Sequence, residues 1–249
     1  SDSDSVTASV LSAIGSATTG TVTVTNAVAL TGTLSEMTAA LVTSSSKGSV
    51  SDATVTITDA DNTAITATAL SDIGSATTGT VTVSNAVAIS GTTSQAIAAL
   101  VTSGSKVTAD TASVTISDAD STALTASDLS SIGSSTAGTV TVTNAVAITG
   151  TRAENTAALV TAGSKVEVSD ATVTISDADS TAMDASDLSD IGGATTGTVT
   201  VTNAVAISGT AAENTAALVT AGSLVVVSDA TVTISDADST AVDATTLSA

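Results

Sequence analysis

Acidic side chains are the groups in this sequence best suited to chemistry, and they recur as Asp-x-Asp pairs. Their oxygens are hard ligands, so calcium is the one metal that the composition suits. The run from Asp118 to Asp128 resembles a calcium loop, although the central glycine is missing and the last acid falls one position early. The alternative is that these carboxylates are solvated turn residues. The candidate calcium ligands are Asp59, Asp61, Asp118, Asp120, Asp177, Asp179, Asp236 and Asp238.

The residue types that are missing exclude most catalytic chemistry. The chain has no His, Cys, Phe, Tyr, Trp or Pro, which removes imidazole bases, Ser-His and Cys-His nucleophile pairs, and the usual zinc and iron sites. Paired acids alone can hydrolyse glycosides, but a catalytic site is seldom copied on every repeat of a chain. We therefore expect no enzyme, no catalytic residues and no cofactor beyond the calcium just described.

The charge excludes two further classes of partner. The net charge of −20 comes from 24 acidic and 4 basic residues, and it argues against nucleic acid and anionic membrane surfaces. We find no signal peptide and no apolar run long enough to insert into a membrane. Because the chain does not begin with Met, we expect it to be a piece of a longer protein.

A long tandem repeat dominates the sequence. The phrase that begins at Leu11 returns at Leu70, Leu129, Leu188 and Leu247, always with the same spacing and without insertion. Complete repeats span 11–69, 70–128, 129–187 and 188–246, with partial repeats at both ends, so we expect residues 1–249 to form a single solenoid segment. Each repeat divides into two related halves, which predicts two coils per repeat.

Each half-repeat opens with a strictly alternating segment such as TVTVTNA at 139–145 or TVTISDA at 172–178. Alternating β-branched residues predict a strand with Val and Ile buried and Thr exposed. Thr has a high β-propensity and stacks well between strands, which explains its use. The alternative is a flat ice-binding face, since the pattern looks like the Thr-x-Thr arrays of β-solenoid antifreeze proteins. The candidate surface lattice is Thr23, Thr56, Thr82, Thr115, Thr141, Thr174, Thr200 and Thr233.

An Asn or Asp follows each predicted strand. Asn amides could donate to neighbouring Asp carboxylates and backbone carbonyls and form a ladder along the stack, or each residue could simply stabilise its own turn. The candidate turn ladder is Asn26, Asp59, Asn85, Asp118, Asn144, Asp177, Asn203 and Asp236.

Short helices are predicted after the strands. Capping boxes begin at Thr33, Thr92, Thr151 and Thr210, each with Glu or Gln three positions later. A weaker cap at Thr125 predicts a second helix, with Gly133 as a left-handed stop. The expected fold is therefore an α/β solenoid, with a parallel β-sheet on one face and short helices on the other. This layout resembles that of leucine-rich repeats, and a helix-free right-handed β-helix is the alternative.

The phrases TVTVTNAVAISGT, AALVT and TISDADST resemble tandem repeats of very large secreted bacterial surface proteins, adhesin-like and typical of marine cyanobacteria. The resemblance covers essentially the whole chain. It implies an extracellular or cell-surface structural module, such as a fibre, surface layer or adhesin stalk. The expected partners are further copies stacked end to end or neighbouring repeats of a longer chain, with an ice surface as the alternative.

Overall fold

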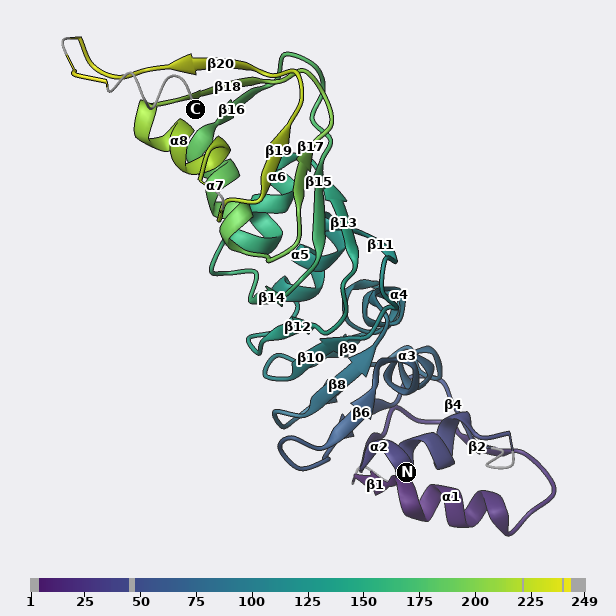
Figure 1. Ribbon diagram of the computed structural model, residues 1–249. Coiled ribbons are helices and arrows are strands. Elements are labelled where there is room, and N and C mark those ends of the chain that lie inside the picture. The colour runs from purple at the N-terminus through teal and green to yellow at the C-terminus, as the bar shows by residue number, and fades with distance from the viewer. Residues whose placement is uncertain (1–4, 45–47, 221, 239, 243–249) are drawn as a thin grey trace. The chain divides into compact units, whose positions relative to one another are not determined.

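The computed structural model (Figure 1) describes all residues except 1–4, 45–47, 221, 239 and 243–249. It divides into two compact units, residues 1–117 with 131–140, and residues 118–130 with 141–249. Both consist of short parallel strands that alternate with short helices, which gives an α/β layout. In the described residues no helix is long and apolar enough to cross a membrane.

In the first unit, strands pair in parallel with strands of the segments that precede and follow them in the chain. One sheet has the order β1-β3-β5-β7-β9, a second contains β6, β8 and β10 as neighbours, and β2 pairs with β4. The strands are β1 (Val6–Thr7), β2 (Val22–Val24), β3 (Ala29–Gly32), β4 (Gly48–Val50), β5 (Thr54–Ile57), β6 (Ala64–Thr66), β7 (Val81–Val83), β8 (Ala88–Gly91), β9 (Val107–Thr108) and β10 (Ser113–Ile116).

The second unit has the same organisation, with sheet orders β11-β13-β15-β17-β19 and β16-β18-β20. Its strands are β11 (Ala123–Thr125), β13 (Ala147–Gly150), β14 (Val166–Val168), β15 (Thr172–Ile175), β16 (Ala182–Asp184), β17 (Val199–Val201), β18 (Ala206–Gly209), β19 (Val225–Val227) and β20 (Thr231–Ile234). The boundary between the units falls just after β10, within α5 (Ala126–Ser134) and within β12 (Val140–Val142).

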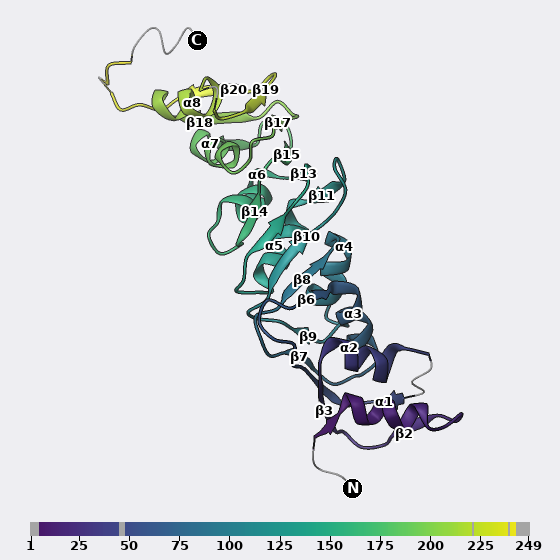
Figure 2. The same ribbon diagram turned by 60° about the horizontal axis from the view of Figure 1, so that its bottom comes forward.

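Helices of two kinds follow the strands. The longer α-helices are α1 (Ala8–Ser16), α3 (Ala67–Ser75), α5 and α7 (Ala185–Gly193). Capped helical turns α2 (Leu34–Met37), α4 (Thr93–Ala96) and α6 (Arg152–Asn155) run into the π-helices η1 (Thr38–Val42), η2 (Ile97–Val101) and η3 (Thr156–Val160). In the last repeat, the equivalent helix α8 (Ala211–Leu218) is α-helical and lies beside α7 (Figure 2).

Aliphatic side chains fill the core between strands and helices. Val55 and Ile57 of β5 and Leu70 and Ile73 of α3 are at most 1% exposed, as the alternation of strand residues and the helical period require. Burial of each such side chain contributes roughly 1.5 to 3 kcal/mol to folding. Met37 and Met183 are also buried, and they supply flexible volume in a core without aromatic residues.

Two kinds of segment alternate along the chain. A two-strand segment, such as β7 and β8 followed by α4, is succeeded by a three-strand segment, such as β9, β10 and β11 followed by α5. All eight predicted strand openings are confirmed as strands, but the expectation of one strand per coil is wrong. The missed strands, such as Ala88–Gly91, contain Ala, Ser and Gly instead of a regular alternation of Val or Ile with Thr, so their pattern does not stand out. The helix-free alternative is also wrong.

The left-handed stop predicted at Gly133 is wrong. Helix α5 continues through Gly133 to Ser134, and none of the described glycines has a positive φ. Gly74 and Gly192, which hold the same position in the adjacent repeats, are needed for a different reason. A Cβ on Gly74 would collide with the carbonyl oxygen of Ser105, and a Cβ on Gly192 with that of Ser223. The backbone just before β9 therefore lies very close to α3, and the backbone just before β19 lies very close to α7.

Left-handed backbone occurs at non-glycine residues in the turn after the Asp-x-Asp pairs. Asn62, Ser121 and Ser180 have φ values of 61°, 64° and 62°. In that conformation, the N–H of Asn62 donates to Ala86 O at 2.8 Å, and that of Ser180 donates to Ala204 O at 2.7 Å. The turn is thus locally strained, and the strained conformation allows its N–H to form a hydrogen bond to the next segment.

We expect this strain to be measurable by substitution at Ser180. Ser180→Asn should raise the free energy of unfolding by about 0.5 kcal/mol, because Asn tolerates the left-handed region better than Ser. Asn62→Ala should lower it by about 1 kcal/mol for the converse reason. Urea denaturation followed by circular dichroism measures both values. Equal stability of both variants and the wild type would show that the turns carry no strain.

Candidate functional site

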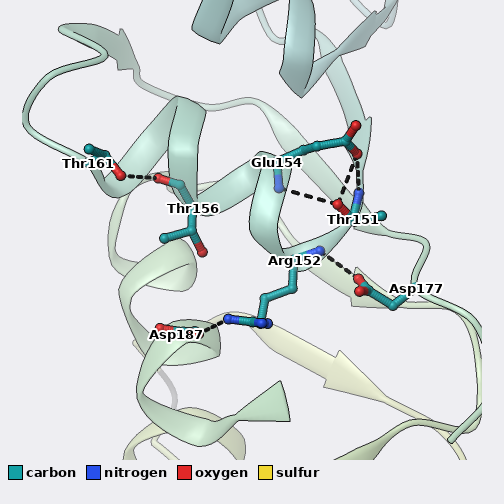
Figure 3. A network of polar contacts seen from close by, with 7 residues as sticks. All are labelled: Thr151, Arg152, Glu154, Thr156, Thr161, Asp177 and Asp187. Atoms are coloured by element: carbon teal, nitrogen blue, oxygen red, sulfur yellow. Dashed lines mark hydrogen bonds and ion pairs between the residues drawn. The ribbon is translucent and has the colours of Figure 1, made fainter. Parts of the chain in front are cut away.

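The candidate site is a polar network at the strand-to-helix turns, which we call the turn network. It comprises the capping-box Thr and Glu or Gln residues, the Asp-x-Asp pairs and the Asn residues that follow β7, β12 and β17. Figure 3 shows it around Thr151. Its members come from consecutive segments of the chain, so its geometry shows how one segment is fastened to the next.

Capping boxes form at all four predicted places. At Thr151, the hydroxyl oxygen accepts from Glu154 N at 3.3 Å, and a Glu154 carboxylate oxygen accepts from Thr151 N at 2.8 Å. Gln95 reproduces the second bond, since its Oε1 accepts from Thr92 N at 2.9 Å. Each box therefore satisfies two backbone donors at the helix start.

The first Asp of a pair reaches back to the start of an earlier helix. The carboxylate of Asp59 accepts from Leu34 N at 2.6 Å, that of Asp177 from Arg152 N at 2.5 Å, and that of Asp236 from Ala211 N at 2.8 Å. These amides belong to the first residue of each helix, which the capping box leaves without an acceptor. A residue from the following segment thus completes the cap.

The second Asp reaches forward to the next turn. Asp61 Oδ1 accepts from Ala86 N at 2.9 Å, and the equivalent bonds of Asp120 and Asp179 to Ala145 N and Ala204 N are both 3.1 Å long. The two carboxylates of a pair therefore serve amides in opposite directions along the chain. In the described residues, no three acidic side chains gather as a metal site would require. The predicted calcium ligands are thus not brought together, and Asp238 is exposed.

The predicted turn ladder forms in part. The side-chain amides of Asn85, Asn144 and Asn203 donate to the backbone carbonyls of Asp59, Asp118 and Asp177, at 2.7, 2.6 and 2.5 Å. The acceptor is thus the carbonyl, one of the two acceptors that we predicted, and the carboxylates of Asp59 and Asp177 are engaged by helix amides. Asn26 is exposed after β2. Each bond joins neighbouring segments, so the Asn residues do more than stabilise their own turns.

The predicted Thr lattice is not one continuous column. Thr56 pairs with Thr82, and Thr174 pairs with Thr200. However, Thr23 pairs with Ser49, Thr115 with Ser90 and Thr233 with Ser208, and Thr141 is exposed in β12. The reason is that the middle strand of a three-strand segment pairs backwards with the second strand of the preceding segment. The observed Thr ladders are Thr7–Thr31–Thr56–Thr82–Thr108 and Thr125–Thr149–Thr174–Thr200.

Sequence reasoning missed a set of buried threonines. The hydroxyl of Thr77 donates to Ala53 O at 2.6 Å and accepts from Gly79 N at 3.0 Å. Thr136 and Thr195 make the same two bonds with their own Ala and Gly partners. The recurrence of Thr-x-Gly at the same position of every repeat, shortly after the phrase that begins at Leu11, Leu70, Leu129 and Leu188, was the signal that could have revealed them.

A shallow groove beside the capped helix occurs in each unit at equivalent positions. One groove, of about 420 Å³, is lined by residues that include Leu34, Thr38 and Asp59, and the other, of about 460 Å³, by residues that include Ala211, Thr215 and Asp236. Arg152 occupies the equivalent place in another repeat, where it forms an ion pair with Asp187 (Figure 3). The carboxylates of Asp59 and Asp236 already accept hydrogen bonds from helix amides. The grooves are therefore better explained as shallow irregularities of the surface than as ligand sites.

The capping boxes affect the protonation of their glutamate side chains. The hydrogen bond from the Thr151 backbone, followed by that from its hydroxyl, lowers the pKa of Glu154, and Thr210 lowers the pKa of Glu213 in the same way. A carboxyl whose folded pKa lies below its unfolded value, about 4.3, stabilises the fold above that pH. This stability is lost as the pH falls through the folded pKa.

We therefore expect Glu154→Gln together with Glu213→Gln to flatten the acid limb of the stability profile. Gln95 shows that an amide keeps the geometry of the box, so the variant should lose only the proton-linked part. Melting temperatures across the range from neutral pH to below the pKa of a free Glu measure the difference from the wild type. An unchanged acid limb would contradict the assignment to these two carboxyls.

No protein-family model, curated protein or solved structure matches the chain. The function proposed below therefore depends on the contacts described above and on the sequence pattern.

Proposed function

We propose that the chain is a segment of an extracellular structural module, a solenoid that acts through length and stiffness in a fibre, a surface layer or an adhesin stalk. The observation that carries the proposal is that the same contacts recur with the period of the sequence repeat. The Asn-to-carbonyl bonds, the Asp-to-helix bonds and the buried Thr bonds each return in further repeats.

The polar groups of the turn network support this role. The hydrogen bonds of its Asp and Asn side chains are directed at backbone atoms of neighbouring segments, so these residues connect one segment to the next. Uniform nearest-neighbour contacts are what a stacked array needs. We propose no catalytic role, because the Asp-x-Asp pairs have the same structural use in successive repeats. An extracellular location follows from the resemblance to secreted bacterial surface repeats.

Lengthening the chain tests the proposal. A variant with residues 70–187 duplicated contains two additional repeats, hence four additional rows. At about 4.8 Å per row, it should be longer by roughly 20 Å with an unchanged cross-section. Small-angle X-ray scattering of both proteins measures length and cross-section separately. An increase in cross-section without a gain in length would refute the solenoid.

The second candidate is an ice-binding face, and the observed Thr ladders favour it. Five parallel strands that are neighbours in one sheet place Thr7, Thr31, Thr56, Thr82 and Thr108 in register. In this case the protein should produce thermal hysteresis, and Thr56→Lys with Thr82→Lys should abolish it. Lys at the exposed Thr43 and Thr102, outside the ladder, is the matched control. Absence of hysteresis in the wild type would exclude this role.

A further inference from the structure

We propose that the helical segment formed by α6 and η3 binds an internal water molecule through the side chains of Arg152, Asn155 and Thr156. All three residues belong to the second unit, in the interior of the chain. The site goes beyond the proposed structural function, because it assigns a ligand to one particular repeat. Arg152 also forms an ion pair with Asp187 of α7, so the site lies where α6 and α7 meet.

Three neighbouring polar atoms of this segment are buried without a partner. Within the described part of the chain, Nε of Arg152, Oδ1 of Asn155 and Oγ1 of Thr156 are closed off from solvent and have no hydrogen-bond partner. Residues at positions i, i+3 and i+4 lie on one face of a helix, so the three side chains are neighbours. An unmet buried polar atom is costly to the fold, and three of them together indicate a bound molecule that satisfies them.

Asn155 is the most deeply buried member of the site, with an exposed fraction of 0%. Its Nδ2 donates to Gly150 O and Thr151 O, both at 3.0 Å. These two bonds fix the orientation of the amide, so the atom without a partner is Oδ1, which can only accept. Met37 and Ala96 hold the equivalent positions and are buried as well. Asn155 therefore brings a polar group to a place that is apolar in the first two repeats.

The hydroxyl of Thr156 is oriented differently from those of its equivalents. Thr38 and Thr215 each donate to the backbone carbonyl four positions earlier, at 2.8 and 2.7 Å. Thr156 does not form this bond, although it occupies the same place in the repeat. Figure 3 shows the hydroxyl on the side of η3 that faces the ion pair of Arg152 with Asp187. The turned hydroxyl indicates that Thr156 has a polar partner on that side.

Charge and size together point to water as the ligand. The Arg152 guanidinium disfavours a cation, and the carboxylates of Asp177 and Asp187, both in contact with Arg152, disfavour an anion. The ligand must accept a hydrogen bond from Nε and donate one to Oδ1 of Asn155, while the Thr156 hydroxyl can do either. Because the three atoms are closed off from solvent, only a very small molecule fits. Water meets every requirement, and internal waters typically make about three hydrogen bonds.

The fourth repeat shows why the site is confined to the third. Asn214 has the same two backbone bonds as Asn155 and the same unmet Oδ1. However, the position of Arg152 is taken by Ala211, which has no side-chain donor, and the Thr215 hydroxyl is already bonded to the backbone. The fourth repeat thus offers one unmet atom where the third offers three, and an internal water needs roughly two to four partners.

The bound water gives the Arg152 side chain a second anchor. Nη1 holds the guanidinium against Asp187, and the water holds Nε against η3. Leu34 and Ala211, at the equivalent positions of other repeats, border the shallow grooves described above. In the third repeat, a hydrated ion pair therefore takes the place of the groove and strengthens the contact between α6 and α7.

Magnetic relaxation dispersion of water nuclei, which counts internal waters by their long residence times, tests the site in solution. Asn155→Met with Thr156→Val removes two of the three partners and copies the buried Met37 of the first repeat, so the count should fall by about one. Asn214→Met with Thr215→Val makes the same two changes one repeat later and should leave the count unchanged. Circular dichroism checks that both variants are folded. An unchanged count in the first variant, or an equal fall in both, would overturn the proposal.

A crystal structure of the unaltered chain gives a second measurement that does not depend on a variant. We expect a water within hydrogen-bond distance of Arg152 Nε, Asn155 Oδ1 and Thr156 Oγ1, and none that bridges the equivalent residues of the fourth repeat. Ordered side chains that bond directly to one another, with no water among them, would refute the site. Either result leaves the solenoid untouched, because the duplication experiment decides on it independently.

Discussion

Gly192→Ala should lower the free energy of unfolding by about 3 kcal/mol, whereas Gly193→Ala, at the next position, should not destabilise the protein. A Cβ at Gly192 would lie within 3.0 Å of the Ser223 carbonyl oxygen, closer than such atoms are found. The obstacle is backbone, which cannot rotate away as a side chain would. Nothing lies within 4 Å of a Cβ at Gly193, and Ala is favoured over Gly in a helix by up to about 1 kcal/mol.

Urea denaturation of the two variants, read by circular dichroism, makes the comparison. The two substitutions add the same methyl group to adjacent residues of α7, so composition and helix propensity cancel. The midpoint should fall for Gly192→Ala and hold or rise for Gly193→Ala. Similar midpoints would mean that Ser223 does not approach the helix as closely as the structure shows.

Thr195→Val should cost about 2 kcal/mol, the second largest effect that we expect. The buried Thr195 hydroxyl donates to Ala171 O at 2.6 Å and accepts from Gly197 N at 3.0 Å. Valine has nearly the same shape but leaves a buried carbonyl and a backbone N–H without this partner. Such unmet groups cost more than the average hydrogen bond contributes.

Thr196→Val is the control for this prediction. Thr196 also donates to a backbone carbonyl, Ser169 O, at 2.9 Å, but its side chain is exposed and water can replace the lost bond. Its effect should stay within about 0.5 kcal/mol. Thermal and urea unfolding of the two variants give the comparison, and an equal loss of stability in both would show that burial does not set the value of this contact.

Much of the local structure could be predicted from sequence because it depends on nearby residues. The capping boxes at Thr33, Thr92, Thr151 and Thr210 have formed, since a cap needs only the residue three positions later. The eight alternating segments are strands because their pattern is long enough to mark a buried face. Asn85 and its equivalents donate to the neighbouring Asp carbonyls, which are one of the two kinds of acceptor that the ladder was expected to use.

The remainder could not be predicted because it depends on which segments become neighbours. The Thr column was predicted by assuming that equivalent strands stack on each other, but β5 pairs backwards with β3. The use of Gly74 and Gly192 depends on a carbonyl in the next segment of the chain, which no local turn preference reveals. The Asp-x-Asp pairs were interpreted as possible ligands because their backbone partners belong to other segments.

The short distance along the chain between paired strands has a consequence for how the protein folds. Partners such as Val55 and Val81 belong to consecutive segments, so pairing these strands does not require the closure of a long loop. Low contact order is associated with fast folding. A newly synthesised chain could therefore add each segment to the one before it, with the exposed edge of the last strand serving as the template for the next.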